Sequence, residues 1–261
     1  MRRKTPLYTK LDIEYQQVYS GPYEDVSTSK IIAGIKEGRI TGFGRPVIDF
    51  SAPKEEIEKL WSISQKIWYR DYLTDGLSEV SKFLLRKNIL ARPTYHQVID
   101  LTKSESELHE GLRKSYKSLV NKGDSFFIDS DIGWLYASVQ KLHHRVYGKA
   151  TRSNETWAIQ TAMMRQRELF ALVEGDPEIF SAGLFYHNGY VCYYGVGCSL
   201  PGVDTHALVW KAILHAKEIG CKLFEIGEQY YNGDEKLQNI AKFKRGFGGR
   251  AVVRLDFDTT R

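Results

Sequence analysis

Two glutamates in "FEIGEQYYNGDEK" stand where a carboxylate can act as a general base. Glu225 lies within a short apolar run that predicts a strand, and Glu228 follows just past its end. Alternation along a strand puts Glu225 and Gly227 on one face and Phe224 and Ile226 on the other. A carboxylate partly removed from water has a raised pKa and can accept a proton from an ammonium nucleophile. The alternative is a carboxylate paired with a nearby lysine or arginine.

The run "IAKFKRGFGGRAV" supplies positive charge just after these glutamates. It holds four basic side chains, two phenylalanines, three glycines and no acid. Alone it reads as a basic tail or a nucleic-acid patch. Placed between one predicted strand and a closing strand, it becomes a helix end and turn directed back at the site. Phe243 can then anchor it, while Lys244 can meet a phosphate or an oxyanion.

A second anion site is predicted in "GCSLPGVDTHALVW", between the end of a strand and the start of a helix. The backbone N–H groups near Thr205, His206 and Ala207 would face an anion placed there. Gly197, just upstream, would let a ligand approach the backbone. We expect these four residues to form a pyrophosphate site. The alternative is an ordinary strand–turn–helix connection.

Basic residues cluster in "LHEGLRKSYKSLVNKG", among them Arg113 and Lys117. They can bind an anion. Equally, they can complement the dipole at the carboxyl end of a helix. Tyr230 can line the same site or merely pack.

The periodicity of the chain predicts an α/β protein with a mixed sheet. In the first part we expect a helix in 51–73 that begins near Ser51, an extended stretch in 83–101, and a helix in 102–123 with a Ser104–Glu107 capping box. From residue 131 the order is helix, helix, antiparallel meander, helix, strand, helix, strand. The two helices are 131–148 and 153–168, and the meander has three strands, 169–175, 179–189 and 190–199. The remaining elements are 206–220, 221–227, 234–247 and 250–257. A strand–helix–strand unit after a meander predicts ligand binding where the strands diverge.

Composition favours a soluble globular chain. It has 261 residues, a net charge of +5, and no apolar run long enough to span a membrane. The basic start lacks the apolar core of a secretory signal. Its three cysteines, Cys192, Cys198 and Cys221, cannot all pair, which fits a reducing interior. We therefore expect a cytoplasmic protein, although its substrate can lie at a membrane surface.

The motifs of zinc hydrolases, serine hydrolases, P-loops and dinucleotide-binding folds are absent, so no metal is expected.

Taken in order, several blocks resemble the FemAB-like branch of the GNAT acyltransferase superfamily, which includes Fem-type aminoacyl transferases and acyltransferases of surface-polysaccharide pathways. The resemblance covers roughly residues 90–257, and its most specific element is Phe-Lys-x-x-Phe-Gly at Phe243 to Gly248. The blocks are "VIDL", "LHEGLRKSYKSLVNKG", "AGLFYHNGYVCYYGVGCS", "LVWKAILHAKEIGCKLFEIGE" and "LQNIAKFKRGFGG". The chain departs from relatives in lacking the usual Arg/Gln-x-x-Gly-x-Gly/Ala run and a long coiled-coil arm.

The resemblance implies two GNAT-like subdomains that share a cleft, the first often degenerate, with a boundary near 125–135. We accordingly expect subdomains at 1–130 and 131–261. It also implies acyl transfer to an amine, with Lys244 catalytic. In such a reaction Glu225 or Glu228 would be the base, and the predicted pyrophosphate site would hold the phosphates of the acyl donor. Arg113, Lys117, Tyr230 and Phe243 would bind an anionic acceptor, such as a nucleotide-linked or lipid-linked sugar. No tightly bound cofactor is implied, and acyl-CoA is the expected co-substrate.

Three hypotheses follow. The leading one is an N-acyltransferase that acts on an amino sugar or a similar cell-surface precursor. The second is an aminoacyl-tRNA-dependent transferase that acts on such a precursor, which would make tRNA a partner. The third is a non-catalytic anion- or RNA-binding module on the same fold.

Overall fold

A computed structural model describes residues 10–41, 47–48, 52–72, 76–122, 126–129, 133–175 and 178–260. The chain divides into two compact units: unit 1 comprises Met1–His96 with Val252–Arg261, and unit 2 comprises Gln97–Ala251. Segment 97–122 contributes Ile99, Leu108 and Val120 to the main buried core of unit 2. The expected GNAT-like subdomains at 1–130 and 131–261 stay a prediction.

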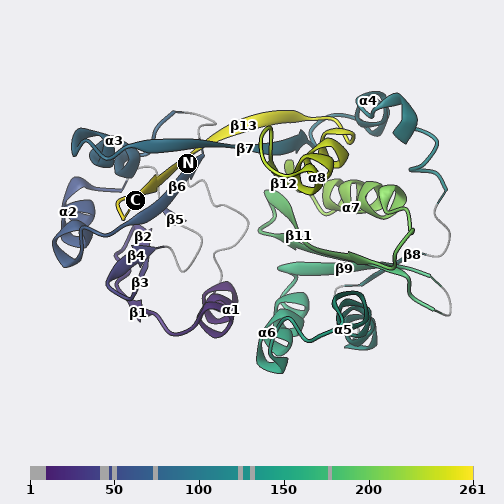
Figure 1. Ribbon diagram of the computed structural model, residues 1–261, viewed down its shortest axis with the longest axis horizontal. Helices are drawn as coiled ribbons and strands as arrows, with labels where there is room; N and C mark the ends of the chain where they lie inside the picture. The colour runs from purple at the N-terminus through teal and green to yellow at the C-terminus, as the bar shows by residue number, and fades with distance from the viewer. Residues whose placement is uncertain are drawn as a thin grey trace. The chain divides into compact units, whose positions relative to one another are not determined.

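Unit 2 is a mixed sheet with helices on both faces, and Figure 1 shows α7 and α8 on one face and α5 and α6 on the other. The mixed α/β architecture predicted from the sequence is confirmed. The elements are the end of β7 (Ala91–Asp100), α4 (Glu105–Glu110), the 3₁₀ turn η1 (Lys114–Tyr116), β8 (Phe126–Asp129), α5 (Gly133–Tyr147), α6 (Asn154–Arg165), β9 (Leu169–Glu174), β10 (Ser181–His187), β11 (Val191–Ser199), α7 (His206–Glu218), β12 (Leu223–Gln229), α8 (Glu235–Arg245) and the start of β13 (Arg250–Asp258).

The sheet of unit 2 runs in the order β12-β11-β10-β9-β8. Strands β9 to β11 pair antiparallel, as the predicted meander requires, and β8, which was not predicted, pairs antiparallel with β9. Strands β11 and β12 pair parallel, and α7 connects them along the chain. Helix α7 packs on this sheet through an apolar face on which Leu208 and Ile213 are fully buried. Each such side chain contributes roughly 1.5–3 kcal/mol relative to exposure. The helix ends before Gly220, whose φ of 91° is one that glycine adopts at little cost.

Unit 1 combines short strands with three helices in its described residues. The strands β1, β3 and β4 form one small antiparallel sheet, β2 pairs with β5, and β6 pairs antiparallel with β13. Its core includes Ile57, Leu84 and Phe257. The elements are α1 (Lys10–Ser20), β1 (Glu24–Asp25), β2 (Ile31–Ile32), β3 (Gly34–Lys36), β4 (Arg39–Thr41), β5 (Val47–Ile48), α2 (Lys54–Ile63), β6 (Trp68–Tyr72) and α3 (Glu79–Arg86).

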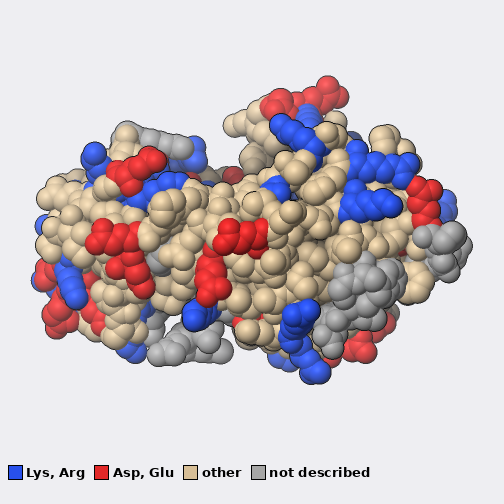
Figure 2. Space-filling model, turned by 90° about the horizontal axis from the view of Figure 1, so that it is seen from below, with Lys and Arg blue, Asp and Glu red and all other residues tan. Residues whose placement is uncertain are grey.

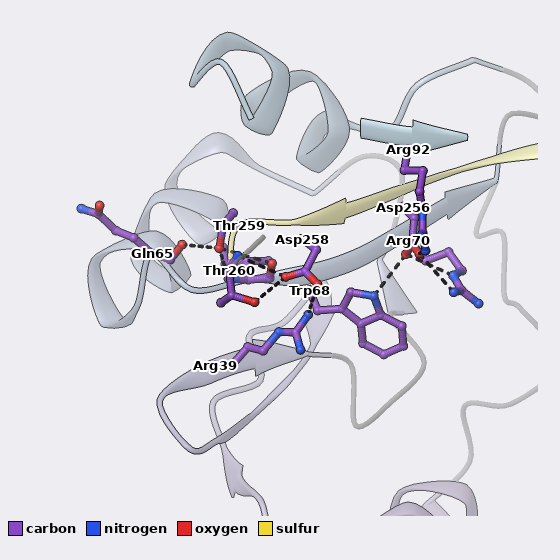
Figure 3. A network of polar contacts seen from close by, with 10 residues as sticks. Arg39, Gln65, Trp68, Arg70, Arg92, Asp256, Asp258, Thr259 and Thr260 are labelled. Carbon is purple, nitrogen blue, oxygen red and sulfur yellow. Dashed lines mark hydrogen bonds and ion pairs between the residues drawn. The ribbon is translucent and has the colours of Figure 1, made fainter. Parts of the chain in front are cut away.

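A buried carboxylate fastens β13 to its neighbours in unit 1 (Figure 3). Asp256, 6% exposed, accepts hydrogen bonds from Arg70 at 3.2 Å, from Arg92 at 3.2 Å and from the Trp68 indole at 3.1 Å. A buried charge is tolerated only when it is paired and hydrogen-bonded in this way. The network is therefore a structural element of unit 1.

Three sequence predictions in the first part of the chain are corrected. The helix expected in 51–73 ends at Ile63, because the aromatic run that follows forms β6; Ser51 lies outside the described residues. The extended stretch expected in 83–101 begins only at Ala91, since α3 extends to Arg86. The helix expected in 102–123 is short: its Ser104–Glu107 capping box is present, but α4 ends before Gly111.

Charge is spread over the surface in small groups. On the face drawn in Figure 2, lysines and arginines are interspersed with aspartates and glutamates. None of the described helices is both long and apolar enough to cross a bilayer.

Candidate active site

The parallel strands β11 and β12 pair over only part of their length. The ladder joins Val191 to Leu223 and ends where Tyr193 faces Glu225, yet β11 continues to Ser199 and β12 to Gln229. A bulge in the β10–β11 ladder leaves Gly195 unpaired just past this point. Bulges bend a strand away from its partner. The strands thus separate at their carboxyl ends, where ligands bind in open α/β sheets.

Lys244 lies against the end of β12. Its Nζ donates to the backbone carbonyl of Glu228 at 3.2 Å, and a Cβ placed on Gly227 would stand 2.8 Å from that nitrogen. Gly227 has a φ of 113°, a region that L residues rarely adopt. Burial lowers the pKa of Lys244, while the carboxylates of Glu228 and Glu225 act in the opposite direction. A desolvated amine is therefore held beside two carboxylates.

The two glutamates differ in exposure. Glu225 is only 2% exposed and is the last residue of β12 that pairs with β11. Glu228 is half-buried near the end of the strand, so its carboxylate can exchange protons with a substrate. The arrangement brings a half-buried carboxylate and a lysine to a place where two strands separate; the catalytic roles predicted for Lys244, Glu228 and Glu225 stay predictions.

An aromatic cluster joins the segments that the sequence predicted to meet. It consists of Tyr116 from η1, His206 at the start of α7, Phe243 from α8 and Phe247 just after it. The Tyr116 ring lies edge-on to His206 with centroids 4.0 Å apart and to Phe247 at 5.2 Å. The His206 ring meets Phe243 at 5.0 Å. In addition, the Tyr116 hydroxyl donates to the Phe243 carbonyl at 3.1 Å. This cluster fixes the last turn of α8, and hence Lys244.

The start of α7 is already occupied by a carboxylate. The backbone N–H of His206 donates to Asp204 at 2.8 Å, and the His206 ring contacts the same oxygen. Burial disfavours ionisation of Asp204, but these two hydrogen bonds hold its pKa below the ordinary value. Thr205 is the N-cap residue and makes no side-chain capping bond, while Ala207 is buried. A phosphate placed here would meet a negative charge.

Gly197 gives room to a side chain of the same strand. A Cβ there would overlap the Tyr194 hydroxyl, so the absence of a side chain already has a packing explanation. The donor-binding role predicted for Gly197, Thr205, His206 and Ala207 stays a prediction.

The residues predicted to bind an acceptor are placed differently from one another. Arg113 donates from Nη2 to the Lys242 carbonyl at 2.9 Å and lies over the Tyr116 ring at 5.1 Å, so it caps the end of α8. Lys117 is half-buried after η1, and Tyr230 is half-buried directly after β12. Phe243 also lines a hollow on the surface of α8, together with Glu235, Lys236, Asn239 and Ile240.

Arg152, in the loop between α5 and α6, was not predicted. Its Nε and Nη1 are buried and bond to none of the described residues, and its guanidinium lies 5.2 Å from the Trp157 ring. Burial raises the pKa of Cys198, near the end of β11, to about 12, and nearby Arg152 acts in the opposite direction. Burial, with Arg152 and His144, lowers the pKa of neighbouring His143 to about 4. An anion bound at this place would meet the positive charge of Arg152. No sequence motif marks the position of Arg152.

Residues that could hold a metal ion are not grouped in the described ranges: no three His, Cys, Asp or Glu side chains come together there. The three cysteines are free and buried.

Comparison with known proteins identifies the fold. No protein-family model matches the sequence, and no curated protein matches it. Among solved structures, FemX superposes over 98% of this chain and 92% of its own, with a TM-score of 0.69 and 12% identity. L-PGS from Bacillus licheniformis matches over 97% and 88%, with a TM-score of 0.63 and 13% identity.

A third similar structure is the C-terminal domain of an Agrobacterium fabrum protein assigned as a lysylphosphatidylglycerol synthetase, which covers 87% of this chain and 80% of its own at 13% identity, with a TM-score of 0.61. The resemblance predicted from the ordered sequence blocks is thus confirmed as a likeness of fold.

Proposed function

Starting from the fold that this chain shares with FemX, we propose that it transfers an aminoacyl group from an activated ester to the amine of a phosphate-bearing cell-surface precursor. The observation that carries the proposal is the group of Lys244, Glu228 and Gly227 where β12 leaves its partner strand.

The reaction needs a base, a stabilised oxyanion and two substrates held together. Glu228 takes the proton that the attacking ammonium must lose. The amine nitrogen then bonds to the carbonyl carbon, and the carbonyl oxygen becomes an oxyanion beside Lys244. Collapse of this intermediate expels the ester oxygen, which takes up the proton that the attacking nitrogen loses as the amide forms. A fixed positive donor beside the oxyanion lowers the barrier by roughly 3–4 kcal/mol.

The start of α7 favours an aminoacyl ester over acyl-CoA as the donor. Asp204 accepts from the first amide of the helix, and its lowered pKa keeps it ionised near neutral pH. A coenzyme A pyrophosphate at this helix start would be repelled. One similar structure is assigned as an enzyme whose name joins a lysyl group to a phosphate-bearing lipid, which also fits aminoacyl transfer.

Arg152 supplies an anion subsite in this proposal. Its two buried donors without partners lie near Cys198, close to the end of β11, whereas Lys244 lies at the end of β12. Arginine binds phosphate through planar, directional donors. We assign it to a phosphate of the acceptor, for which a nucleotide-linked or lipid-linked amino sugar has the required chemistry.

The decisive experiment supplies both donor classes to the purified protein. A bacterial tRNA pool charged with radiolabelled amino acids, or a panel of labelled acyl-CoA thioesters, is incubated with nucleotide-linked and lipid-linked amino sugars. We expect label to move from tRNA to the acceptor, and to do so only without RNase and with Lys244 present. Transfer from acyl-CoA after RNase treatment would instead establish the acyl-CoA enzyme, which is the second candidate.

A further inference from the structure

Gln229, the last residue of β12, has an unused hydrogen-bond donor. Its side chain is 4% exposed, and its Oε1 accepts from Arg245 Nη1 at 3.1 Å. Its Nε2 is buried and has no hydrogen-bond partner within the described part of the chain. Buried polar groups are nearly always paired, so each exception needs an explanation.

The orientation of this carboxamide is fixed by its neighbour. A guanidinium has donors and no acceptor, so Arg245 can bind only the oxygen of Gln229. The amide therefore cannot flip, and its NH₂ group points away from Arg245. Arg245 itself is steadied by stacking over the Tyr231 ring at 5.5 Å.

Gln229 and Lys244 are brought to the same end of β12 by contacts with α8. Lys244 bonds to the carbonyl of Glu228, and Arg245 bonds to the side chain of Gln229. Two consecutive residues of α8 are thus tied to two consecutive residues of β12. An oxygen that reached Gln229 Nε2 would be shielded from water, where hydrogen bonds to a developing negative charge are strongest.

We propose that Gln229 is a catalytic residue whose NH₂ group donates to the acyl carbonyl oxygen as it becomes an oxyanion, with Arg245 as its positioning residue. The inference rests on the proposed acyl transfer and adds a second, neutral donor beside Lys244. As the amine bonds to the carbonyl carbon, the π electron pair moves onto this oxygen. It returns when the ester oxygen leaves, so the residue gains and loses no proton.

The substitution Gln229→Glu tests this role sharply, because it keeps an oxygen facing Arg245 and replaces only the NH₂ group. We expect kcat to fall roughly 100-fold, with KM changed less than about twofold, as for loss of one oxyanion donor. Gln238→Glu, on the exposed side of α8, is the matched control and should leave kcat unchanged. Because a new buried charge can destabilise the fold, Gln229→Met is measured alongside and should lose kcat equally.

The pH dependence separates a chemical role from a structural one. Protonation of the carboxyl introduced by Gln229→Glu restores an O–H donor, so the ratio of variant to wild-type kcat should rise as pH falls. Arg245→Met should free the amide to rotate and lower kcat about 10-fold, with partial recovery in Arg245→Lys.

The outcomes distinguish this inference from the proposed function. If the wild-type protein transfers label and either folded Gln229 variant keeps wild-type kcat, the role of Gln229 is refuted and acyl transfer stands. A wild-type protein inactive with every donor would refute both.

Discussion

Gly227→Ala tests whether the position of Lys244 matters for activity. The new methyl group would stand 2.8 Å from Lys244 Nζ and 3.5 Å from its Cε. A methyl group and a nitrogen need about 3.5 Å, so the amine must move by roughly 0.7 Å. Displacements near 1 Å can cost about 100-fold in rate. We therefore expect kcat to fall about 10- to 100-fold.

The same substitution also strains the backbone, and a matched control separates the two effects. Gly227 has a φ of 113°, a conformation that costs alanine roughly 1–3 kcal/mol. Gly233 has a φ of 115°, and a Cβ there would meet only Leu237, at 3.9 Å. Gly233→Ala should thus show a similar loss of stability without moving Lys244.

Two measurements on each variant decide the matter. Thermal unfolding should show both melting temperatures lowered by roughly 2–10 °C. Single-turnover transfer of label, measured well below those temperatures, should be impaired only in Gly227→Ala. Equal rates for the two variants would refute the argument that Lys244 must lie where Gly227 leaves room.

Three further predictions concern the same region. Lys244→Met should abolish transfer yet raise the melting temperature at pH 7, measured by calorimetry. The lowered pKa of Lys244 means that folding disfavours its charged form, so removing the amine should stabilise the fold. The exposed control Lys242→Met should change neither transfer nor melting temperature. Glu225→Gln removes a charge that raises the pKa of Lys244, so the alkaline limb of the pH–rate profile should move to lower pH, and an unmoved limb would contradict this coupling. Gly246→Ala would overlap the Tyr116 ring and should cost about 1–3 kcal/mol of stability by urea unfolding, with an unchanged midpoint as the contrary result.

The second half of the fold could be predicted from the sequence because its signals are local. The apolar face of α7 and its glycine stop, the Asn188–Gly189 hairpin and the acidic start of α8 each lie within one short segment. In the first half, Trp68 and its neighbours continue a helical pattern yet form a strand, since pairing with β13 decides their conformation. That partner lies almost 190 residues away, beyond the reach of periodicity.

Some residues of the candidate site could likewise be predicted from local sequence signals, and others could not. Glu225, Glu228 and Lys244 were found because a strand end and a basic helix end are visible in sequence. Arg152 has no motif around it, and only the structure shows that its donors lack partners. The role of Gln229 was equally hidden, since it depends on the guanidinium of Arg245 that fixes the amide.

The Phe-Lys-x-x-Phe-Gly element has a physical explanation in the way α8 ends. The backbone N–H of Phe247 donates to the Lys244 carbonyl at 3.2 Å in the turn that follows α8, and the Phe247 ring packs against Phe243 with centroids 5.2 Å apart, so both rings enter the aromatic cluster. Lys244, one position further round the helix, must then point elsewhere, toward the end of β12. Gly248, the glycine of the element, has a φ of 82°, and a Cβ there would stand 2.7 Å from the carbonyl oxygen of Gly111. The two phenylalanines, the lysine and the glycine of the element thus each make a different contact, and the packing of the other three helps to place the lysine.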